Sequence, residues 1–224
     1  MQKFFLAPSI LSADFARLGE DTQKAIDAGG DFIHFDVMDN HYVPNLTMGP
    51  MILESLRRYN IIVPIDVHLM IKPVDSLIPQ FAKAGATFIT VHPESTLHLD
   101  RTLNLIKKYG CKVGLAFNPS TPLNFLDHVL DKLDMIVLMS VNPGFSNQSF
   151  IRSTLFKLRE VRKRLDAFSS NILLQVDGGI KIENISEVAL AGANVFVIGS
   201  CLFQCSNYKN IINRIREKLN NSCS

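Results

Sequence analysis

The sequence lacks the cysteine patterns that build a metal cluster or a disulfide framework. Four cysteines occur in 224 residues, and none of them belongs to a CxxC pair. Cys201 and Cys205 lie close together but no second pair accompanies them, which argues against a zinc site made from cysteine. With Cys111 and Cys223 added, the cysteines remain too few for a disulfide framework in a chain of this length. We therefore expect a reduced, cytoplasmic protein.

The sequence also lacks an excess of charge and a long apolar run. Its net charge of +2 is spread along the chain, so we expect no nucleic-acid partner. The Lys and Arg residues within 152–165 have helical spacing and predict a solvated helix face, with an oligomer or anion contact as the alternative. No run approaches the ~20 apolar residues of a membrane helix. The first apolar run is short and broken by Pro8 and Ser9, so we expect neither a signal peptide nor a membrane partner.

The sequence does contain a regular alternation of short apolar segments with amphipathic segments between most of them. The apolar segments predict strands at residues 4–11, 32–38, 65–70, 88–92, 112–117, 135–141, 172–177 and 195–200. The amphipathic segments predict helices at residues 21–29, 47–58, 76–85, 99–110, 123–133, 154–165 and 183–192. Alternation of strands and helices indicates a parallel sheet.

Glycine marks the ends of several predicted helices. Gly29, Gly85 and Gly192 each follow an alanine, and a predicted strand begins within three residues. Gly110 occupies the same place before the strand at 112–117. Glycine is the usual residue just past a helix end because it accepts the left-handed conformation without a Cβ clash. The repeated unit, with no linker between halves, predicts a single α/β domain over residues 1–224, a (β/α)8 (TIM) barrel.

The main alternative fold is an open doubly wound sheet. That fold usually carries a GxGxxG phosphate-binding turn after its first strand. Here the corresponding residues, 10–15, read ILSADF and contain no glycine. The missing motif favours the barrel.

Polar residues gather on inward rows near the carboxyl ends of the predicted strands, where barrel enzymes place their active sites. In the stretch HFDVMD, His34 and Asp36 share one face because side chains alternate along a strand. Asp66 and His68 share the equivalent row of the next strand, and Asp177 ends the seventh. Any one of these residues alone would be read as a polar strand end that finds a hydrogen-bond partner.

Two histidines and two aspartates near a barrel axis are costly to bury unless a positive charge pairs with them. Their nitrogen and oxygen ligands suit zinc, iron(II), manganese(II) or cobalt(II), and the sequence does not choose among these. We predict one divalent metal ion per subunit, held by His34, Asp36, His68 and Asp177. The sequence gives no reason to assign His92 or Glu94 to this site.

A second signal concerns phosphate. Gly178 and Gly179 follow the seventh strand, and Gly199 and Ser200 follow the eighth. These loops of a barrel commonly hold phosphate, and backbone amides at the following helix starts complement an anion. Plain turn glycines are the alternative reading.

Several stretches carry a resemblance to a known family. They are APSILSADF (7–15), HFDVMDNHYVPN (34–45), DVHLM (66–70), GLAFNPSTP (114–122), VLMSVNPGF (137–145), VDGGI (176–180) and VIGS (197–200). In these stretches the sequence resembles the ribulose-phosphate 3-epimerase family of the pentose phosphate pathway. The resemblance implies a ribulose-phosphate-binding barrel and a cytoplasmic, homo-oligomeric isomerase of carbohydrate metabolism. It also implies a divalent metal on His34, Asp36, His68 and Asp177.

The implied reaction interconverts D-ribulose 5-phosphate and D-xylulose 5-phosphate through proton abstraction and return at C3, with an enediolate intermediate. Asp36 is predicted to be the base and Asp177 the acid for ribulose 5-phosphate, and the roles reverse for xylulose 5-phosphate. The metal would stabilise the negative charge that develops on the substrate oxygens. A carboxylate is otherwise a weak base for a carbon acid.

The resemblance also implies which residues contact the sugar phosphate. Contacts with substrate are implied for Ser9 and His68, a closing loop for Gly144, Phe145, Ser146 and Asn147, and phosphate binding for Gly178, Gly179, Gly199 and Ser200. Three methionines near the same strand ends, Met38, Met70 and Met139, either pack in the core or line the enediolate as a polarizable floor.

The sequence departs from the family pattern at a few positions. Asn40 stands where the family usually has glycine, and Tyr42 where it usually has phenylalanine. Because asparagine tolerates the left-handed region better than most residues, we expect the turn at Asn40 to survive. Ser146 and Asn147 replace two glycines in the closing loop, which predicts a stiffer or differently shaped loop.

Three other functions compete with this prediction. A 3-epimerase for a related ketose phosphate, such as allulose 6-phosphate, would use the same metal site. A decarboxylase or aldol-type synthase on a related barrel would carry Asp-x-Lys-x-x-Asp, whereas residues 36–39 read DVMD without the lysine. A non-catalytic barrel that only binds sugar phosphate is disfavoured because all four predicted ligands are present.

Overall fold

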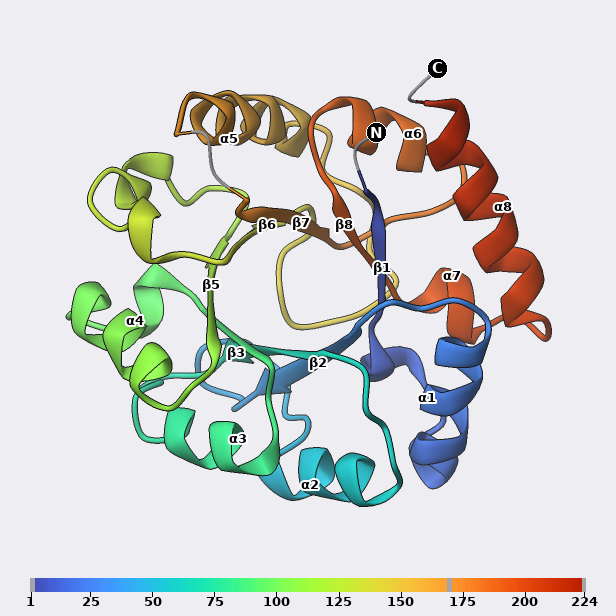
Figure 1. The fold of residues 1–224 in the computed structure, drawn as a ribbon, viewed down its shortest axis with the longest axis horizontal. Coiled ribbons are helices and arrows are strands. Elements are labelled where there is room, and N and C mark those ends of the chain that lie inside the picture. Colours follow the sequence, from blue (N-terminus) through green and yellow to red (C-terminus); the bar gives the residue numbers. More distant parts are fainter. Residues whose placement is uncertain (1–2, 169–170, 223–224) are drawn as a thin grey trace.

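The computed structural model describes residues 3–168 and 171–222, and an eight-stranded parallel sheet rolled into a ring forms its centre (Figure 1). The strand order is β1-β8-β7-β6-β5-β4-β3-β2, and a bridge between Ser9 and His34 joins the two end strands. The strands are β1 (Phe5–Pro8), β2 (Ile33–Met38), β3 (Ile65–Met70), β4 (Phe88–Val91), β5 (Lys112–Phe117), β6 (Met135–Met139), β7 (Leu173–Asp177) and β8 (Val195–Ile198). The predicted (β/α)8 barrel is confirmed, and the open doubly wound sheet is wrong.

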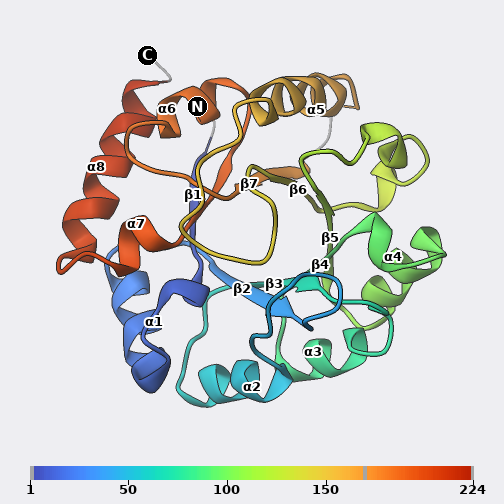
Figure 2. The ribbon, with the colours of Figure 1, turned by 180° about the vertical axis from the view of Figure 1, so that it is seen from behind.

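Helices cover the outside of the ring in the connections between strands (Figures 1 and 2). In the described part of the chain they are α1 (Leu18–Asp27), α2 (Pro50–Arg58), α3 (Ile78–Ala84), α4 (Leu99–Lys108), α5 (Thr154–Phe168), α6 (Ile185–Leu190), α7 (Ser200–Phe203) and α8 (Tyr208–Asn221). Short 3-10 helices are η1 (Ile10–Ser12), η2 (Phe15–Arg17), η3 (Pro93–Ser95), η4 (Leu123–Leu126) and η5 (Leu130–Lys132).

Two sequence predictions are corrected by these boundaries. The first strand was predicted to reach residue 11, but it ends at Pro8, and the chain then turns into η1. The helix predicted at 123–133 is replaced by η4 and η5. Its buried residues Leu123, Leu126 and Val129 are spaced by three, which is the period of a 3-10 helix rather than an α-helix.

The glycines predicted to end helices have the expected backbone conformation. Gly29, Gly85, Gly110 and Gly192 all have positive φ, between 79° and 117°. L-residues with a Cβ rarely adopt this region, so glycine here lets each helix turn directly into the following strand.

The apolar core has two parts, separated by the wall of strands. The larger part lies between strands and helices and includes Phe35, Phe81 and Leu53, all fully buried. Smaller clusters fill the interior of the ring, one of them around Phe88 and Met135. Because strands such as β2 are buried on both faces, any polar residue on their inward rows must find a partner inside the ring.

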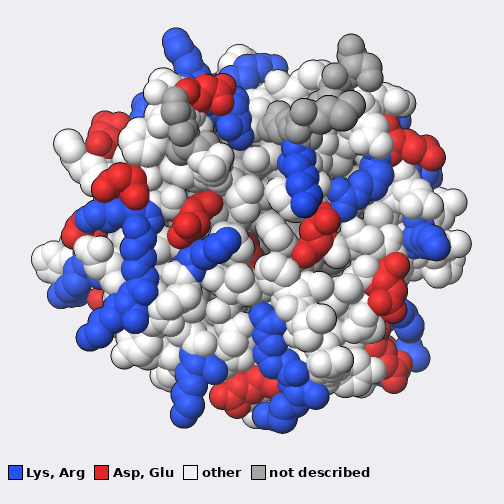
Figure 3. Space-filling model, in the orientation of Figure 1, with Lys and Arg blue, Asp and Glu red and all other residues white. Residues whose placement is uncertain are grey.

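The surface agrees with the expectations from composition. On the face shown in Figure 3, Lys and Arg side chains are interspersed with Asp and Glu, and no patch of one sign dominates. Of the basic residues of 152–165, Arg152 lies just before helix α5 and pairs with Glu187, whereas Arg164 lies in α5 and pairs with Asp127. No helix in the described ranges has the length and apolar character needed to cross a bilayer.

The cysteines that the structure describes are separate thiols. Cys111, Cys201 and Cys205 are free, whereas Cys223 lies outside the described residues. Burial, with smaller contributions from nearby acidic groups, raises the pKa of Cys201 to about 11. A reactive thiolate at Cys201 is therefore disfavoured at neutral pH.

Candidate active site

The candidate site starts from two neighbouring strands whose inward rows are in register. Strands β2 and β3 pair in parallel, which places His34 opposite Asp66 and Asp36 opposite His68. Side chains alternate along a strand, so Phe35 packs in the outer apolar layer while its neighbours point into the ring. The two strands therefore bring two imidazoles and two carboxylates together inside the barrel.

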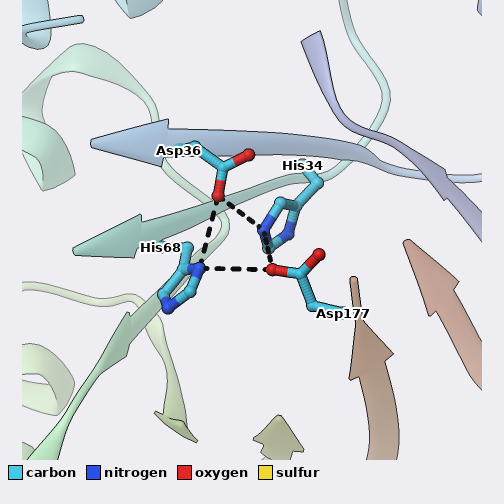
Figure 4. Close-up of side chains that lie close together, drawn as sticks. All are labelled: His34, Asp36, His68 and Asp177. Carbon is cyan, nitrogen blue, oxygen red and sulfur yellow. Dashed lines mark hydrogen bonds and ion pairs between the residues drawn. The ribbon is translucent and has the colours of Figure 1, made fainter. Parts of the chain in front are cut away.

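Asp177, the last residue of β7, completes the cluster from another part of the ring (Figure 4). Its Oδ2 lies 3.5 Å from Nε2 of His34 and 3.7 Å from Nδ1 of His68. Oδ1 of Asp36 lies 3.1 Å and 3.3 Å from the same two nitrogens. One ligand atom from each residue lies within 4.8 Å of the others. The structure thus brings together all four residues predicted to be metal ligands.

The donor atoms fit a divalent cation at the centre of this cluster. Nδ1 of His68 is buried and finds no hydrogen-bond partner among the described residues, although it points toward two carboxylate oxygens. A buried nitrogen without a partner is costly, and a cation between Asp36 and Asp177 would accept its lone pair. Two imidazole nitrogens and two carboxylate oxygens are a donor set found for zinc and for the divalent ions of iron, manganese and cobalt.

The pKa shifts within the cluster also indicate that its carboxylates favour a nearby positive charge. Burial opposes protonation of His34, but the charge of Asp36 and hydrogen bonds to Asp177, Asp36 and Asp66 outweigh it and raise the pKa of His34 well above its usual value. Burial likewise opposes ionisation of Asp36, yet His34 and His68 outweigh it and lower the pKa of Asp36. The cluster therefore favours added positive charge, which a bound cation would supply.

Asp66 supports His34 from behind the cluster. Its Oδ2 accepts a hydrogen bond from Nδ1 of His34 at 2.8 Å and another from Gln175 at 2.9 Å, and its Oδ1 accepts one from Thr90 at 2.8 Å. Burial opposes ionisation of Asp66, and its hydrogen bonds to His34 and Gln175 outweigh burial, so that its pKa is lowered. A carboxylate in this position fixes which nitrogen of a ligand histidine carries the hydrogen. A Cβ on Gly114 would collide with Thr90, which explains glycine in the middle of β5.

The role of Asp66 was not predicted from the sequence, although it shares an inward row with His68. The signal was present in the alternation along IDVHLM. What the sequence could not show was the register that places Asp66 beside His34. Thr90 and Gln175 gave no signal of their own, because each is an ordinary polar residue in an apolar strand.

His92 was given no role from the sequence, but it lies directly against the cluster. Its Nε2 is 2.8 Å from Nε2 of His68, and both rings are fully buried. Burial, followed by the nearby His68, lowers the pKa of His92 well below its usual value, so this ring is neutral. Behind it, Glu94 accepts hydrogen bonds from Tyr42 and Asn118.

A pocket opens above the cluster at the carboxyl ends of the strands. Asp36 and Asp177 line it, whereas His34 and His68 lie beneath it and are fully buried. The predicted substrate-contacting residues that line this pocket are Ser9, Gly144, Phe145, Ser146, Asn147, Gly178, Gly179, Gly199 and Ser200. His68 is not among the lining residues, so its predicted contact with substrate stays a prediction.

Ser9 connects the pocket to the cluster. Its hydroxyl donates a 2.6 Å hydrogen bond to Oδ2 of Asp36, and the other oxygen of that carboxylate faces the two histidines. Ser9 therefore orients Asp36 so that one oxygen serves the cluster and the other faces the pocket. Met38, Met70 and Met139 line the same pocket and also belong to apolar clusters inside the ring, which combines the two alternatives left open by the sequence.

The glycines at one end of the pocket have backbone conformations and close contacts that exclude a Cβ. Gly178 has a φ of 115° and Gly179 a φ of 63°. A Cβ on Gly178 would collide with Val141, and one on Gly179 would reach within 2.8 Å of the Phe150 nitrogen. Both positions therefore require glycine, and the backbone following β7 is left bare toward the pocket. Lys181 also lines this end.

The loop between β6 and α5 crosses the mouth of the ring (Figure 2). Its Gly144 carbonyl accepts a 2.7 Å hydrogen bond from the side chain of Asn45, and Gln148 donates to the carbonyls of Asn142 and Phe145. Asn147 has a φ of 61°, so this asparagine takes the left-handed conformation at a position where the resemblance led us to expect glycine. The loop is therefore tied down within itself and to the connection after β2.

The turn at Asn40 keeps the conformation expected from the sequence, with a φ of 56°. The carboxylate of Asp39 holds this turn, because it accepts hydrogen bonds from the backbone amides of His41, Tyr42 and Lys72 at 2.7–2.8 Å. Asn40 thus takes the left-handed conformation that this turn requires, as asparagine does more readily than most other residues with a side chain.

Comparison with known proteins identifies the family. The family model described as "Ribulose-phosphate 3 epimerase family" matches residues 5–203. The chain belongs to this family. It is 76% identical over 219 residues to the ribulose-phosphate 3-epimerase of Buchnera aphidicola subsp. Acyrthosiphon pisum (strain APS), which covers 98% of this chain and 96% of that protein. Identity is 64% to the ribulose-phosphate 3-epimerase of Escherichia coli (strain K12), over 98% of this chain and 97% of that protein. The chain is accordingly an enzyme, an isomerase of the epimerase type.

Solved structures with low sequence identity share the barrel. KGPDC from Streptococcus mutans matches with a TM-score of 0.71 at 13% identity and covers 100% of both chains. 3-Hexulose-6-phosphate synthase from Salmonella typhimurium matches with a TM-score of 0.69 at 15% identity, over 98% of this chain and 99% of that chain. At such identities the likeness concerns the fold alone, and family membership separates this epimerase from the decarboxylase or synthase alternative.

Proposed function

We propose that this enzyme interconverts D-ribulose 5-phosphate and D-xylulose 5-phosphate. The observation that carries the proposal is the pairing of two carboxylates, Asp36 from β2 and Asp177 from β7, at the floor of one pocket. Epimerisation removes a proton from one face of a carbon and returns one to the other face, so it needs two acid–base groups on separate elements. The names of the curated relatives support the same substrate.

We further propose that one divalent metal ion per subunit is held by His34, Asp36, His68 and Asp177. The assignment is supported by the buried Nδ1 of His68, which has no hydrogen-bond partner in residues 3–168 and 171–222, and by the raised pKa of His34. When bound, such a cation stabilises negative charge that develops on substrate oxygens beside C3. Zinc, iron(II), manganese(II) and cobalt(II) all suit the donor set.

The residues of the chain perform the proton transfers. Asp36, oriented by the hydroxyl of Ser9, takes the C3 proton of ribulose 5-phosphate, and Asp177 delivers a proton to the opposite face. For xylulose 5-phosphate the two aspartates exchange roles, as microscopic reversibility requires. The planar enediolate between the two steps lies against the apolar floor made by Met38, Met70 and Met139.

Binding of the sugar phosphate is assigned to the loops around the pocket. We assign the phosphate to the backbone after β7 and β8, at Gly178, Gly179, Gly199 and Ser200, where glycine leaves the amides accessible. The loop Gly144, Phe145, Ser146 and Asn147 covers the substrate and excludes water from the reacting carbon. We also propose that the chain forms one domain and works as a homo-oligomer in the cytoplasm.

The proposal is tested by incubating the metal-loaded enzyme with D-ribulose 5-phosphate in D2O and following C3 by proton NMR. We expect the C3 proton signal to disappear as deuterated xylulose 5-phosphate forms. Asp36→Asn or a chelator should abolish the exchange, while the exposed control Asp131→Asn leaves it intact. If the enzyme converts allulose 6-phosphate but not ribulose 5-phosphate, the proposed substrate is wrong and the chemistry stands. If it converts neither sugar phosphate, the proposed reaction is refuted.

A further inference from the structure

The buried histidine behind the cluster, His92, faces His68 from the side away from the carboxylates. It follows β4, which pairs with β3, so the two rings come from adjacent strands. Their Nε2 atoms lie 2.8 Å apart, and the rings stack with centroids 5.0 Å apart. Two ring nitrogens at this distance share one hydrogen, so one ring donates and the other accepts.

The direction of this hydrogen bond follows from the other nitrogen of His68. Its Nδ1 points at Asp36 and Asp177, at 3.3 Å and 3.7 Å. A metal ion bound there needs the lone pair of Nδ1, so a neutral His68 must carry its hydrogen on Nε2. His68 then donates and His92 accepts, which requires the hydrogen of His92 to be on Nδ1.

A carboxylate lies near that second nitrogen, beyond hydrogen-bond distance. Oε2 of Glu94 lies 3.9 Å from Nδ1 of His92, which has no hydrogen-bond partner among the described residues, and it accepts a hydrogen bond from the hydroxyl of Tyr42. The other oxygen of Glu94 accepts hydrogen bonds from Asn118 and Thr121. These three partners hold the carboxylate in place, and its negative charge favours a hydrogen on the near nitrogen of His92.

We propose that His92 is a positioning residue, which fixes His68 as a neutral ligand through Nδ1, with Glu94 fixing the tautomer of His92 in turn. The inference rests on the proposed metal site. The two ligand histidines are then supported differently. His34 binds through Nε2 with the charged Asp66 behind it, whereas His68 binds through Nδ1 with a neutral ring behind it.

The first test measures zinc affinity, by competition with a chromophoric chelator, for the full-length protein and three variants. His92→Phe keeps a ring but removes the acceptor, whereas His92→Gln keeps an acceptor oxygen. The exposed His128→Gln is the matched control. Loss of an outer partner of a metal ligand weakens binding by about 10–100-fold, so we expect this loss for His92→Phe. His92→Gln should recover most of it, and His128→Gln should match the parent.

A second test reads the tautomers directly. Long-range 15N–1H correlation NMR of the zinc-loaded parent, labelled at its histidines, distinguishes the nitrogen that carries hydrogen from the one that does not. We expect His68 with its hydrogen on Nε2 and His92 with its hydrogen on Nδ1. In Glu94→Gln, the preference of His92 for Nδ1–H should weaken while His68 keeps its tautomer in the metal-bound state.

Three outcomes would overturn the inference. Unchanged zinc affinity in His92→Phe would remove any role for His92, and equal losses in His92→Phe and His92→Gln would reduce that role to packing. A hydrogen on Nε2 of His92 in the parent would reverse the proposed hydrogen bond. If a thermal scan shows that His92→Phe is not folded, the zinc affinity of His92→Gln and the NMR spectrum of the parent still test the inference. A parent that binds no zinc refutes the proposed metal site itself, which separates that failure from a failure of His92 alone.

Discussion

The Asp66→Asn variant offers the sharpest test of how the protein supports the proposed metal site. An amide fits the same space, and its oxygen can accept from His34 and Gln175 while its NH2 group donates to the hydroxyl of Thr90. The substitution therefore keeps the hydrogen-bond geometry and removes one negative charge behind His34. A packing defect is avoided, so a loss of metal affinity would report the charge.

The expected magnitude follows from the position of Asp66. Removal of an outer partner of a metal ligand costs about 10–100-fold in affinity, and the retained geometry places this variant at the lower end. We expect zinc binding to weaken about tenfold, which corresponds to roughly 1.4 kcal/mol. The assay is chelator competition at pH 7 on the metal-free protein, with an apo thermal scan to confirm folding.

The matched control is Asp134→Asn, which makes the same chemical change at a half-buried carboxylate outside the cluster. Asp134 accepts a hydrogen bond from the backbone amide of Val113 at 2.8 Å. Zinc affinity in this control should equal that of the parent. An Asp66→Asn affinity within twofold of the parent would refute the reasoning, and so would an equal loss in Asp134→Asn.

Four further predictions follow from other parts of the structure. Zinc binding near pH 7 should release a proton, since the pKa of His34 is raised in the metal-free cluster; calorimetry in buffers of different ionisation enthalpy detects it. Gly178→Ala should raise KM for the sugar phosphate by about tenfold or more, because a Cβ collides with Val141 and the positive φ adds ~1–3 kcal/mol of strain. Asp39→Asn should lower the free energy of unfolding by ~1–2 kcal/mol at pH 7 in a denaturant titration. Cys201, with its pKa raised to about 11, should resist alkylation at pH 8 in the native protein and react in denaturant.

Each of these predictions has an outcome that would contradict it. Buffer-independent heats would show that zinc displaces no proton, and an unchanged KM for Gly178→Ala would remove the phosphate assignment from that loop. Fast native alkylation of Cys201 would contradict its raised pKa.

The pH dependence of the unfolding free energy tests the prediction for Asp39→Asn. Burial opposes its ionisation, but its hydrogen bonds to backbone amides outweigh burial and lower its pKa in the folded state. A depressed pKa stabilises the fold above the usual aspartate pKa of ~3.9, and this contribution is lost as pH falls through the folded value. The deficit of Asp39→Asn should therefore be largest at neutral pH and shrink below pH ~4. A deficit that is independent of pH would mean that the carboxylate charge does not hold the turn.

Much of the fold was predictable because its signals are local. The eight apolar segments follow from the short-range periodicity of the sequence. Glycines such as Gly29 and Gly85, which follow helices, reflect a local backbone conformation. The segment 123–133 was mispredicted because an apolar spacing of three suits a 3-10 helix, and its ends carry no strong α-helix signal.

The predicted ligands were identifiable because each lies near the carboxyl end of a strand and has a metal-binding side chain. The residues behind them were not. Asp66 and His92 contact their histidines across neighbouring strands, and those contacts depend on the strand register and the curvature of the ring. One sequence contains no direct record of register between strands, so the outer partners became visible only in three dimensions.

The charge of the buried cluster limits how many protons it can carry during the reaction. Asp36, Asp66 and Asp177 bear one negative charge each when ionised, and a divalent cation would offset two of the three. One proton on Asp36 or Asp177 would then make the cluster neutral, and the two faces of the substrate would share that single proton. Asp66 determines the number of protons that the cluster needs for neutrality, because its hydrogen bonds with His34 and Gln175 lower its pKa and keep it ionised.

Loss of that charge should therefore change the pH profile of the enzyme as well as its metal affinity. In Asp66→Asn the proposed cation and the carboxylates of Asp36 and Asp177 would be neutral without any proton, so protonation of Asp36, the proposed base, should become less favourable. The pKa of the base falls, and the acid limb of the kcat/KM profile should move to lower pH than in the parent. An acid limb that stays in place, or moves to higher pH, would mean that Asp66 does not govern the proton shared by Asp36 and Asp177.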